Sequence, residues 1–116
     1  MDIEFCKVSS YVGTGTTSAQ TVQKLIGLTN NIKDRHVVIV EDTIDSGFTL
    51  DYLIKDLQKE KPKSISLCAM FLKKANLQVE LDIKYIGMTI DPEFVIGYGL
   101  DYDEWGRNIY GLWINK

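Results

Sequence analysis

The stretch VVIVEDTIDSGFTL, residues 37–50, constrains the fold more than any other part of this chain. Four β-branched residues in succession predict a buried strand of a sheet that is covered on both faces. Three acids, Glu41, Asp42 and Asp45, follow the strand, and a turn of small residues then leads into a helix. Ligands of parallel α/β sheets bind beyond the carboxyl ends of the strands, so this stretch predicts a ligand site.

The rest of the chain alternates apolar strands with amphipathic segments, which predicts an α/β domain with a mostly parallel sheet. A run of small polar residues, 11–19, predicts a loop. We expect strands at 3–9, 36–40, 64–72, 83–90 and 94–98, and helices at 19–28 and 49–59.

Composition excludes several classes of protein. The 116 residues suit one domain, and the net charge of −3 argues against nucleic-acid binding. With one histidine and two distant cysteines, a zinc site is not expected, and Cys6 and Cys68 are predicted to be buried thiols in a reducing cytoplasm. The chain has neither an apolar run of about 20 residues nor a basic N-terminal leader. We therefore expect a cytoplasmic protein without a membrane span.

The acidic stretch has two physical interpretations. Carboxylates such as Glu41 and Asp42 accept hydrogen bonds from hydroxyl groups or bind Mg²⁺, and a helix N-terminus behind Ser46 favours a phosphate monoester. Together these features suit a sugar phosphate with free hydroxyls. Alternatively, Asp45 and Ser46 cap the helix, while the other two acids are solvated loop charges. The residues alone leave both interpretations open.

Three motifs in order carry a family resemblance. VVIVEDTIDSGFT resembles the motif with which type I phosphoribosyltransferases bind phosphoribosyl pyrophosphate (PRPP). KVSSY, at 7–11, resembles the opening of the flexible loop in the hypoxanthine-guanine branch, and FVIGYGLDYDEWGRN, at 94–108, is similar to its C-terminal signature. The resemblance implies a type I phosphoribosyltransferase fold in one domain, 1–116, with a flexible active-site loop at 10–19 and a base-binding segment at 94–116.

The resemblance also implies roles for the acidic stretch. Glu41 and Asp42 are expected to bind the ribose hydroxyls of PRPP, directly or through Mg²⁺. Asp45 is expected to face N7 of the purine as general acid and base, because N7 changes protonation when N9 is ribosylated. The residues implied to hold the 5′-phosphate are Ser46, Gly47, Phe48 and Thr49.

Residues after the second long strand are implied to bind the purine. Lys73 stands 21 residues before Phe94, the spacing expected for a cation that reaches the 6-oxo group, and Lys74 competes for this role. Phe94 is implied to stack on the purine, and Val95 to read the ring edge through its backbone. A plain core position remains the alternative for Phe94.

Further roles follow from the two outer motifs. Ser10 and Tyr11 are implied to close over the site and exclude water. Asp101 is implied to help hold a second Mg²⁺, and Arg107 to contact pyrophosphate, with a plain surface charge as the alternative for Arg107. Aromatic residues expected in the core or in an interface are Trp105, Tyr110 and Trp113.

One departure from the family pattern carries an expectation of its own. Members of this branch have several tens of residues before KVSSY, including a strand whose loop binds pyrophosphate, whereas here Met1 stands six residues before Lys7. We therefore expect the N-terminal part of the core to be missing. A missing strand would expose a sheet edge and apolar surface, so a homo-oligomer, a dimer or a tetramer, is expected.

The leading functional hypothesis is purine salvage: transfer of the phosphoribosyl group from PRPP to hypoxanthine or guanine, giving IMP or GMP and pyrophosphate. The alternative is a non-catalytic PRPP- or nucleotide-binding module, or a fragment of such an enzyme that needs a partner chain. A third hypothesis is a flavodoxin- or receiver-like domain with an acidic Mg²⁺ site, which leaves FVIGYGLDY unexplained.

Overall fold

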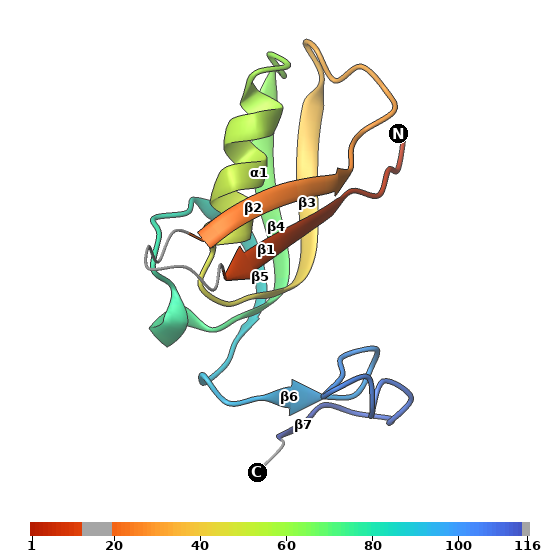
Figure 1. Cartoon of the computed structure of the whole chain (residues 1–116), viewed down its shortest axis with the longest axis vertical. Coiled ribbons are helices and arrows are strands. Elements are labelled where there is room, and N and C mark those ends of the chain that lie inside the picture. The colour runs from red at the N-terminus through yellow and green to blue at the C-terminus, as the bar shows by residue number, and fades with distance from the viewer. Residues whose placement is uncertain (13–19, 115–116) are drawn as a thin grey trace.

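The computed structural model describes residues 1–12 and 20–114 of the chain. Its elements run from the N-terminal hairpin through a strand–helix–strand unit to a small C-terminal pair of strands (Figure 1). In order they are β1 (Lys7–Val12), β2 (Gln20–Ile26), β3 (His36–Ile44), α1 (Phe48–Gln58), β4 (Ser64–Leu72), the 3₁₀ turn η1 (Lys74–Asn76), β5 (Ile83–Thr89), β6 (Val95–Ile96) and β7 (Trp113–Ile114).

The central sheet has the strand order β3-β4-β5, and both of its strand pairs are parallel. The helix α1 connects β3 to β4, as a parallel pair requires. The predicted α/β class and mostly parallel sheet are therefore confirmed. The strand predicted at 64–72 coincides with β4, whereas β3 extends four residues beyond the predicted end at residue 40.

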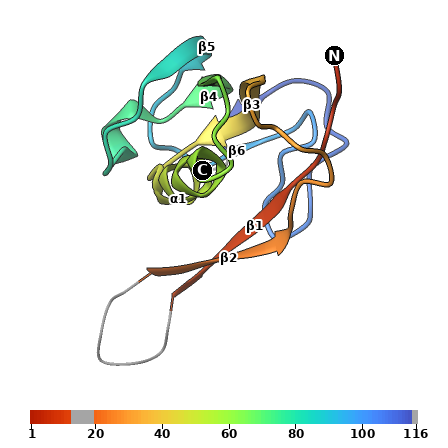
Figure 2. The same cartoon turned by 90° about the horizontal axis from the view of Figure 1, so that it is seen from above.

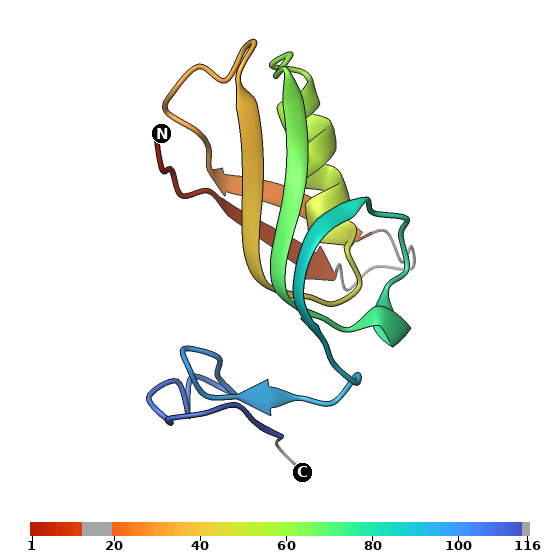
Figure 3. The same cartoon turned by 180° about the vertical axis from the view of Figure 1, so that it is seen from behind.

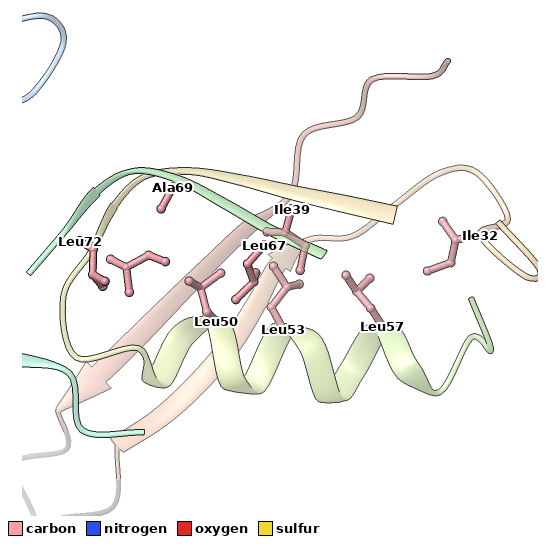
Figure 4. Packing of buried hydrophobic residues seen from close by; sticks show 9 residues of the cluster. Ile32, Ile39, Leu50, Leu53, Leu57, Leu67, Ala69 and Leu72 are labelled. Carbon is pink, nitrogen blue, oxygen red and sulfur yellow. The ribbon is translucent and has the colours of Figure 1, made fainter. Parts of the chain in front are cut away.

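One face of this sheet packs against α1 (Figure 4). Leu50, Leu53 and Leu57 are buried on one side of the helix because they recur at the helical spacing of three and four residues. They meet Ile39 of β3 and Leu67 of β4 in the main hydrophobic cluster. This packing fixes the start of α1 relative to the ends of β3 and β4.

The N-terminal hairpin corrects two sequence predictions. Residues 19–28 were expected to form a helix, but Gln20–Ile26 is a strand paired antiparallel with β1. The apolar spacing suited either structure over so short a segment, and hydrogen bonding to β1 decides for the strand. Viewed from above, α1 lies between the hairpin and the central sheet (Figure 2). Tyr11 and Val12, expected in the loop, belong to β1, and the rest of the predicted loop, residues 13–19, lies outside the described part of the chain.

The other face of the central sheet is open (Figure 3). Val38 and Val40 of β3 are 56% and 74% exposed, and Met70 of β4 is 57% exposed. The prediction of a sheet covered on both faces is therefore wrong for residues 1–12 and 20–114, because α1 and the hairpin lie on the same side. Apolar side chains are thus exposed on this face of the sheet.

The C-terminal segment, residues 90–114, lies beyond the carboxyl ends of the three parallel strands (Figures 1 and 3). The strand predicted at 94–98 shrinks to β6, because the backbone takes positive φ angles at Gly97 and Tyr98. Three aromatic residues were expected in the core or in an interface, and the prediction of a core position is wrong because all three are exposed: Trp105, Tyr110 and Trp113.

Two further observations concern the environment of the chain. Cys6 is exposed and Cys68 is half-buried, so the prediction of buried thiols is wrong for Cys6, which precedes β1 instead of lying within a strand. Within the described residues, no helix is long and apolar enough to cross a membrane.

Candidate functional site

The two acids at the end of β3 leave the strand on opposite faces, since consecutive strand residues alternate. Glu41 is half-buried and Asp42 is exposed. Burial raises the pKa of the Glu41 carboxyl, and the negative charge of Asp42 raises it further. Asp42 accepts a hydrogen bond from the backbone N–H of Thr43. The two carboxylates therefore differ in environment and are available to different ligand groups.

The turn after β3 places a helix N-terminus beside Asp45. Gly47 precedes the helix with φ of 85°, and no side chain caps this end of α1. The interpretation in which Asp45 and Ser46 cap the helix is therefore wrong. The first helical hydrogen bond runs from the N–H of Asp51 to the carbonyl of Gly47, at 2.9 Å. The N–H groups of the first turn point outward from the helix end, where they favour an anion.

Gly47 is required at this turn for two reasons. Its φ lies in the left-handed region, which other residues rarely adopt. A Cβ atom there would also lie 2.7 Å from Cγ2 of Val79 and 3.0 Å from side-chain carbons of Leu77 and Leu81. The helix N-terminus is thus packed directly against the β4–β5 loop, residues 73–82.

Three predicted site residues from different elements meet beside this turn. The Nζ atom of Lys73 lies 3.6 Å from Oδ2 of Asp45 and 5.4 Å from the ring centroid of Phe94. Lys73 is 6% exposed, whereas Asp45 is largely exposed. A buried ammonium group needs a partner, and both the carboxylate and the face of an aromatic ring provide one.

Asn76 contacts Asp45, and the sequence did not predict this contact. Its Nδ2 group donates a hydrogen bond to Oδ1 of Asp45, at 2.8 Å. The only sequence signal was its position, three residues after Lys73 in the polar run KKANLQ. Lys74, the alternative to Lys73, is exposed in η1. Lys73 is buried and paired with Asp45, so the structure favours Lys73 for this role.

Two backbone hydrogen bonds fasten the β4–β5 loop to the β3–α1 turn. The N–H of Lys73 donates to the carbonyl of Ile44 at 2.9 Å, and the N–H of Gln78 donates to the carbonyl of Ser46 at 3.0 Å. Asp45 lies between these two acceptors in the chain. The turn is therefore held on both sides of the residue whose carboxylate faces Lys73.

The remaining predicted residues lie in the C-terminal segment and in β1. Asp101 and Arg107 form an ion pair of 3.1 Å with each other, and the ring of Phe94 makes an edge-to-face contact with Tyr102. Val95 is half-buried in β6. The two residues predicted for the mobile loop lie in β1, where they pair with β2: Ser10 and Tyr11.

The donor set at the end of β3 suits a hard cation. Magnesium prefers oxygen ligands and is commonly held by one or two carboxylates together with oxygens of the substrate. Within residues 1–12 and 20–114, no group of three or more metal-ligating side chains gathers at one point. A cation here would therefore depend on at most two carboxylates, those of Glu41 and Asp42, and on a bound ligand.

Residues 2–103 match the family of the phosphoribosyl transferase domain. The chain is 43% identical to a hypoxanthine-guanine phosphoribosyltransferase of Mycobacterium avium over 91% of its length, and 40% identical to a hypoxanthine phosphoribosyltransferase of Haemophilus influenzae over 94%. A crystal structure of a hypoxanthine phosphoribosyltransferase from Staphylococcus aureus superposes with a TM-score of 0.87 at 38% identity and covers 97% of the chain.

The chain is shorter than these proteins. It spans 52% of the Mycobacterium avium protein, 60% of the Haemophilus influenzae protein and 60% of the Staphylococcus aureus structure. The similarity thus extends over nearly all of this chain and over little more than half of each relative.

Proposed function

The chain belongs to the family of the phosphoribosyl transferase domain and has its type I fold, and from this premise we propose that it serves purine salvage. The reaction would transfer the 5-phosphoribosyl group of PRPP to hypoxanthine or guanine, giving IMP or GMP and pyrophosphate. The observation that carries the proposal is the grouping of Asp45, Lys73 and Phe94 next to the N-terminus of α1.

The sugar phosphate would bind along the end of β3 and the start of α1. The 5′-phosphate would lie at the helix N-terminus, where backbone N–H groups and the helix dipole attract an anion. Glu41 and Asp42 would bind the ribose hydroxyls from opposite sides of the strand end. The residues proposed for the phosphate are Ser46, Gly47, Phe48 and Thr49, and the left-handed Gly47 allows close backbone approach.

The purine would lie between Phe94 and the Asp45 carboxylate. Lys73 would donate to the 6-oxo group, Phe94 would stack on the ring, and the backbone of Val95 would contact its edge. N9 attacks C1′ of the ribose while the bond from C1′ to the pyrophosphate oxygen breaks. The proton on N7 passes to the Asp45 carboxylate, which leaves a neutral purine in the product.

We propose Mg²⁺ as the cofactor of this reaction, since the carboxylates of Glu41 and Asp42 are the hard donors it prefers. Bound there, it would neutralise charge on the pyrophosphate leaving group. Asp101 is proposed for a second Mg²⁺, and Arg107 for pyrophosphate. In the structure these two residues pair with each other, so ligand binding would have to exchange that ion pair.

Closure of the site is proposed for residues 10–19, with Ser10 and Tyr11 nearest the ligand. Such a loop would exclude water from the ribosyl centre and so protect it from hydrolysis. The base-binding role is proposed for residues 94–116, which begin at the ring of Phe94. Both segments would belong to a single domain, 1–116.

A non-catalytic nucleotide-binding role is the second candidate. Retention of a carboxylate beside a buried lysine favours catalysis, because binding alone does not require a proton acceptor opposite N7.

The test combines an activity assay with a binding assay. The purified chain, supplied with Mg²⁺, PRPP and either hypoxanthine or guanine, should form the corresponding nucleotide. Asp45→Asn should lower kcat about 100-fold or more, as expected for a lost general base. Asp34→Asn, two residues before the start of β3 and at the opposite end of that strand from Asp45, is the control and should retain parental activity. If no base is consumed while the parent and Asp45→Asn both bind IMP, the binding module stands and the enzyme does not.

We also propose that the chain acts in the cytoplasm as a homo-oligomer. The thiol of Cys68 fits a reducing compartment. The exposed side chains of Val38, Val40 and Met70 on the open sheet face support self-association. Light scattering coupled to size-exclusion chromatography should give the mass of a dimer or a tetramer. The mass of a monomer would contradict this proposal.

A further inference from the structure

The side chain of Asp45 is held by a hydrogen bond on one carboxylate oxygen and by an ion pair on the other. Asn76 donates from Nδ2 to Oδ1 at 2.8 Å, and the Lys73 ammonium lies 3.6 Å from Oδ2. A carboxylate only accepts hydrogen bonds, so Asn76 must present its NH₂ group and not its carbonyl oxygen. The two contacts together fix the plane of the carboxylate, which one contact would leave free to rotate.

Asn76 is itself held firmly enough to orient another side chain. It ends η1, and its backbone N–H donates to the carbonyl of Lys73 at 3.0 Å. Two residues further on, the N–H of Gln78 donates to the carbonyl of Ser46 at 3.0 Å. The loop that carries Asn76 is thus fastened to the turn that carries Asp45 on either side of the side-chain contact.

From this geometry we infer that Asn76 is a positioning residue for Asp45, an inference that rests on the proposed function. Asn76 orients the carboxylate so that one oxygen is presented to a purine that carries hydrogen on N7. Lys73 cannot do this alone, because its ammonium group is also the proposed donor to the 6-oxo group and would turn away from Asp45 when the base binds.

The inference predicts a ligand preference that can be measured without catalysis. IMP has a bare N7, whereas its 9-deaza C-nucleotide analogue has N7–H, which donates to a carboxylate. A hydrogen bond to a charged group is worth about tenfold or more in affinity. The parent chain should therefore bind the 9-deaza analogue about tenfold more tightly than IMP, as measured by calorimetry.

Variants at residue 76 should remove this preference. Asn76→Ala deletes the donor, and Asn76→Asp keeps the shape but places a second acceptor against Asp45. In both variants the affinities for the two nucleotides should differ by no more than about threefold, in place of the tenfold difference expected for one charge-assisted hydrogen bond. Gln78→Ala is the matched control, since it changes an exposed amide of the same loop and should keep the preference of the parent.

The possible outcomes separate the positioning role of Asn76 from the proposed function of the chain. If the parent shows the preference and both Asn76 variants keep it, the positioning role is overturned while the proposed function stands. If the parent binds both nucleotides equally, Asp45 does not face N7 and the inference falls. If the parent binds neither nucleotide, the proposed function fails and the inference fails with it.

A ligand-free measurement covers the case in which a variant does not fold. The side-chain NH₂ signals of Asn76 in the NMR spectrum of the parent should shift when Asp45 is changed to Ala, because the acceptor at 2.8 Å is lost. Rescue by Asp45→Asn should be partial, since its carbonyl oxygen still accepts. Unchanged Asn76 signals in both variants would overturn the contact on which the inference depends.

Discussion

The site region and the C-terminal segment are held together in different ways. The turn after β3 lies on the hydrophobic cluster under α1, and backbone hydrogen bonds from the β4–β5 loop flank it. The C-terminal segment, 90–114, is joined mainly by short-range contacts, such as the 3.1 Å ion pair of Asp101 with Arg107. Its large aromatic side chains are exposed, with Trp105 at 78% and Tyr110 at 87%.

This difference separates the parts of the site that are preformed from those that need a ligand or another surface. Asp45 and Lys73 lie within ion-pair distance before any substrate binds. Phe94 connects the two regions, since its ring contacts Lys73 on one side and Tyr102 on the other. The predictions below test whether stability and ligand binding depend on the first region far more than on the second.

The largest effect on stability is expected in the hydrophobic cluster between α1 and the central sheet. Leu53 is 3% exposed and packs in the cluster between α1 and the sheet. Leu53→Ala should lower the free energy of unfolding by about 2–5 kcal/mol, because it leaves a cavity under the helix whose N-terminus would hold the phosphate. Urea denaturation followed by circular dichroism measures this. A loss below about 1 kcal/mol would show that α1 is not packed as described.

The next effect concerns the turn itself. Gly47→Ala must place a Cβ 2.7 Å from Val79 while keeping φ near 85°, so we expect about 2–4 kcal/mol of destabilisation and weaker IMP binding. Gly99→Ala is the matched control in the C-terminal segment. Its φ is 94° but the space around it is open, so only the left-handed strain of about 1–2 kcal/mol applies. Equal losses in the two variants would mean that the packing against Val79 contributes nothing.

The same contrast explains what the sequence could predict. The ends of β4 and the face of α1 followed from local pattern, because a nine-residue run with seven apolar residues and a three-to-four spacing each fit one structure. The acids Glu41, Asp42 and Asp45 and the small-residue turn followed from a specific motif. These features are local, so a single sequence contains their cause.

Features set by distant contacts could not be predicted. The hairpin strand β2 depends on pairing with β1, which its own apolar spacing did not indicate. The contact of Asn76 with Asp45 joins residues 31 positions apart and follows from the path of the β4–β5 loop. The open sheet face depends on which elements cover β3, and the apolar composition of a strand does not specify the covering element.

A pH-dependent effect is expected from Glu41. Burial and the charge of Asp42 raise the pKa of this carboxyl in the folded chain, so folding favours its protonated form. The protonated Glu41 carboxyl therefore contributes fully to stability at pH values below its ordinary pKa of 4.5. This contribution is lost as the pH rises through the raised pKa of the folded state. Glu41→Gln should stabilise the chain at pH 7 relative to its parent, and this gain should vanish at pH 4.

Denaturation of the parent and of Glu41→Gln at both pH values measures this difference. Asp42→Asn is the control, because it removes the second cause of the shift and should reduce the loss of stability without abolishing it. A gain for Glu41→Gln that is equal at pH 4 and pH 7 would show that hydrogen bonding or packing of the side chain is responsible and not its charge.

The smallest effect is expected in the C-terminal segment. Trp105 is 78% exposed, so Trp105→Ala should change the free energy of unfolding by no more than about 0.5 kcal/mol at low protein concentration. Repeating the denaturation at high concentration separates two explanations of the exposed ring. If Trp105 is an interface residue, the parent should gain stability with concentration and the variant should not. A large loss at low concentration would instead show that this ring is packed within one chain, and the contrast between the two regions would then fail.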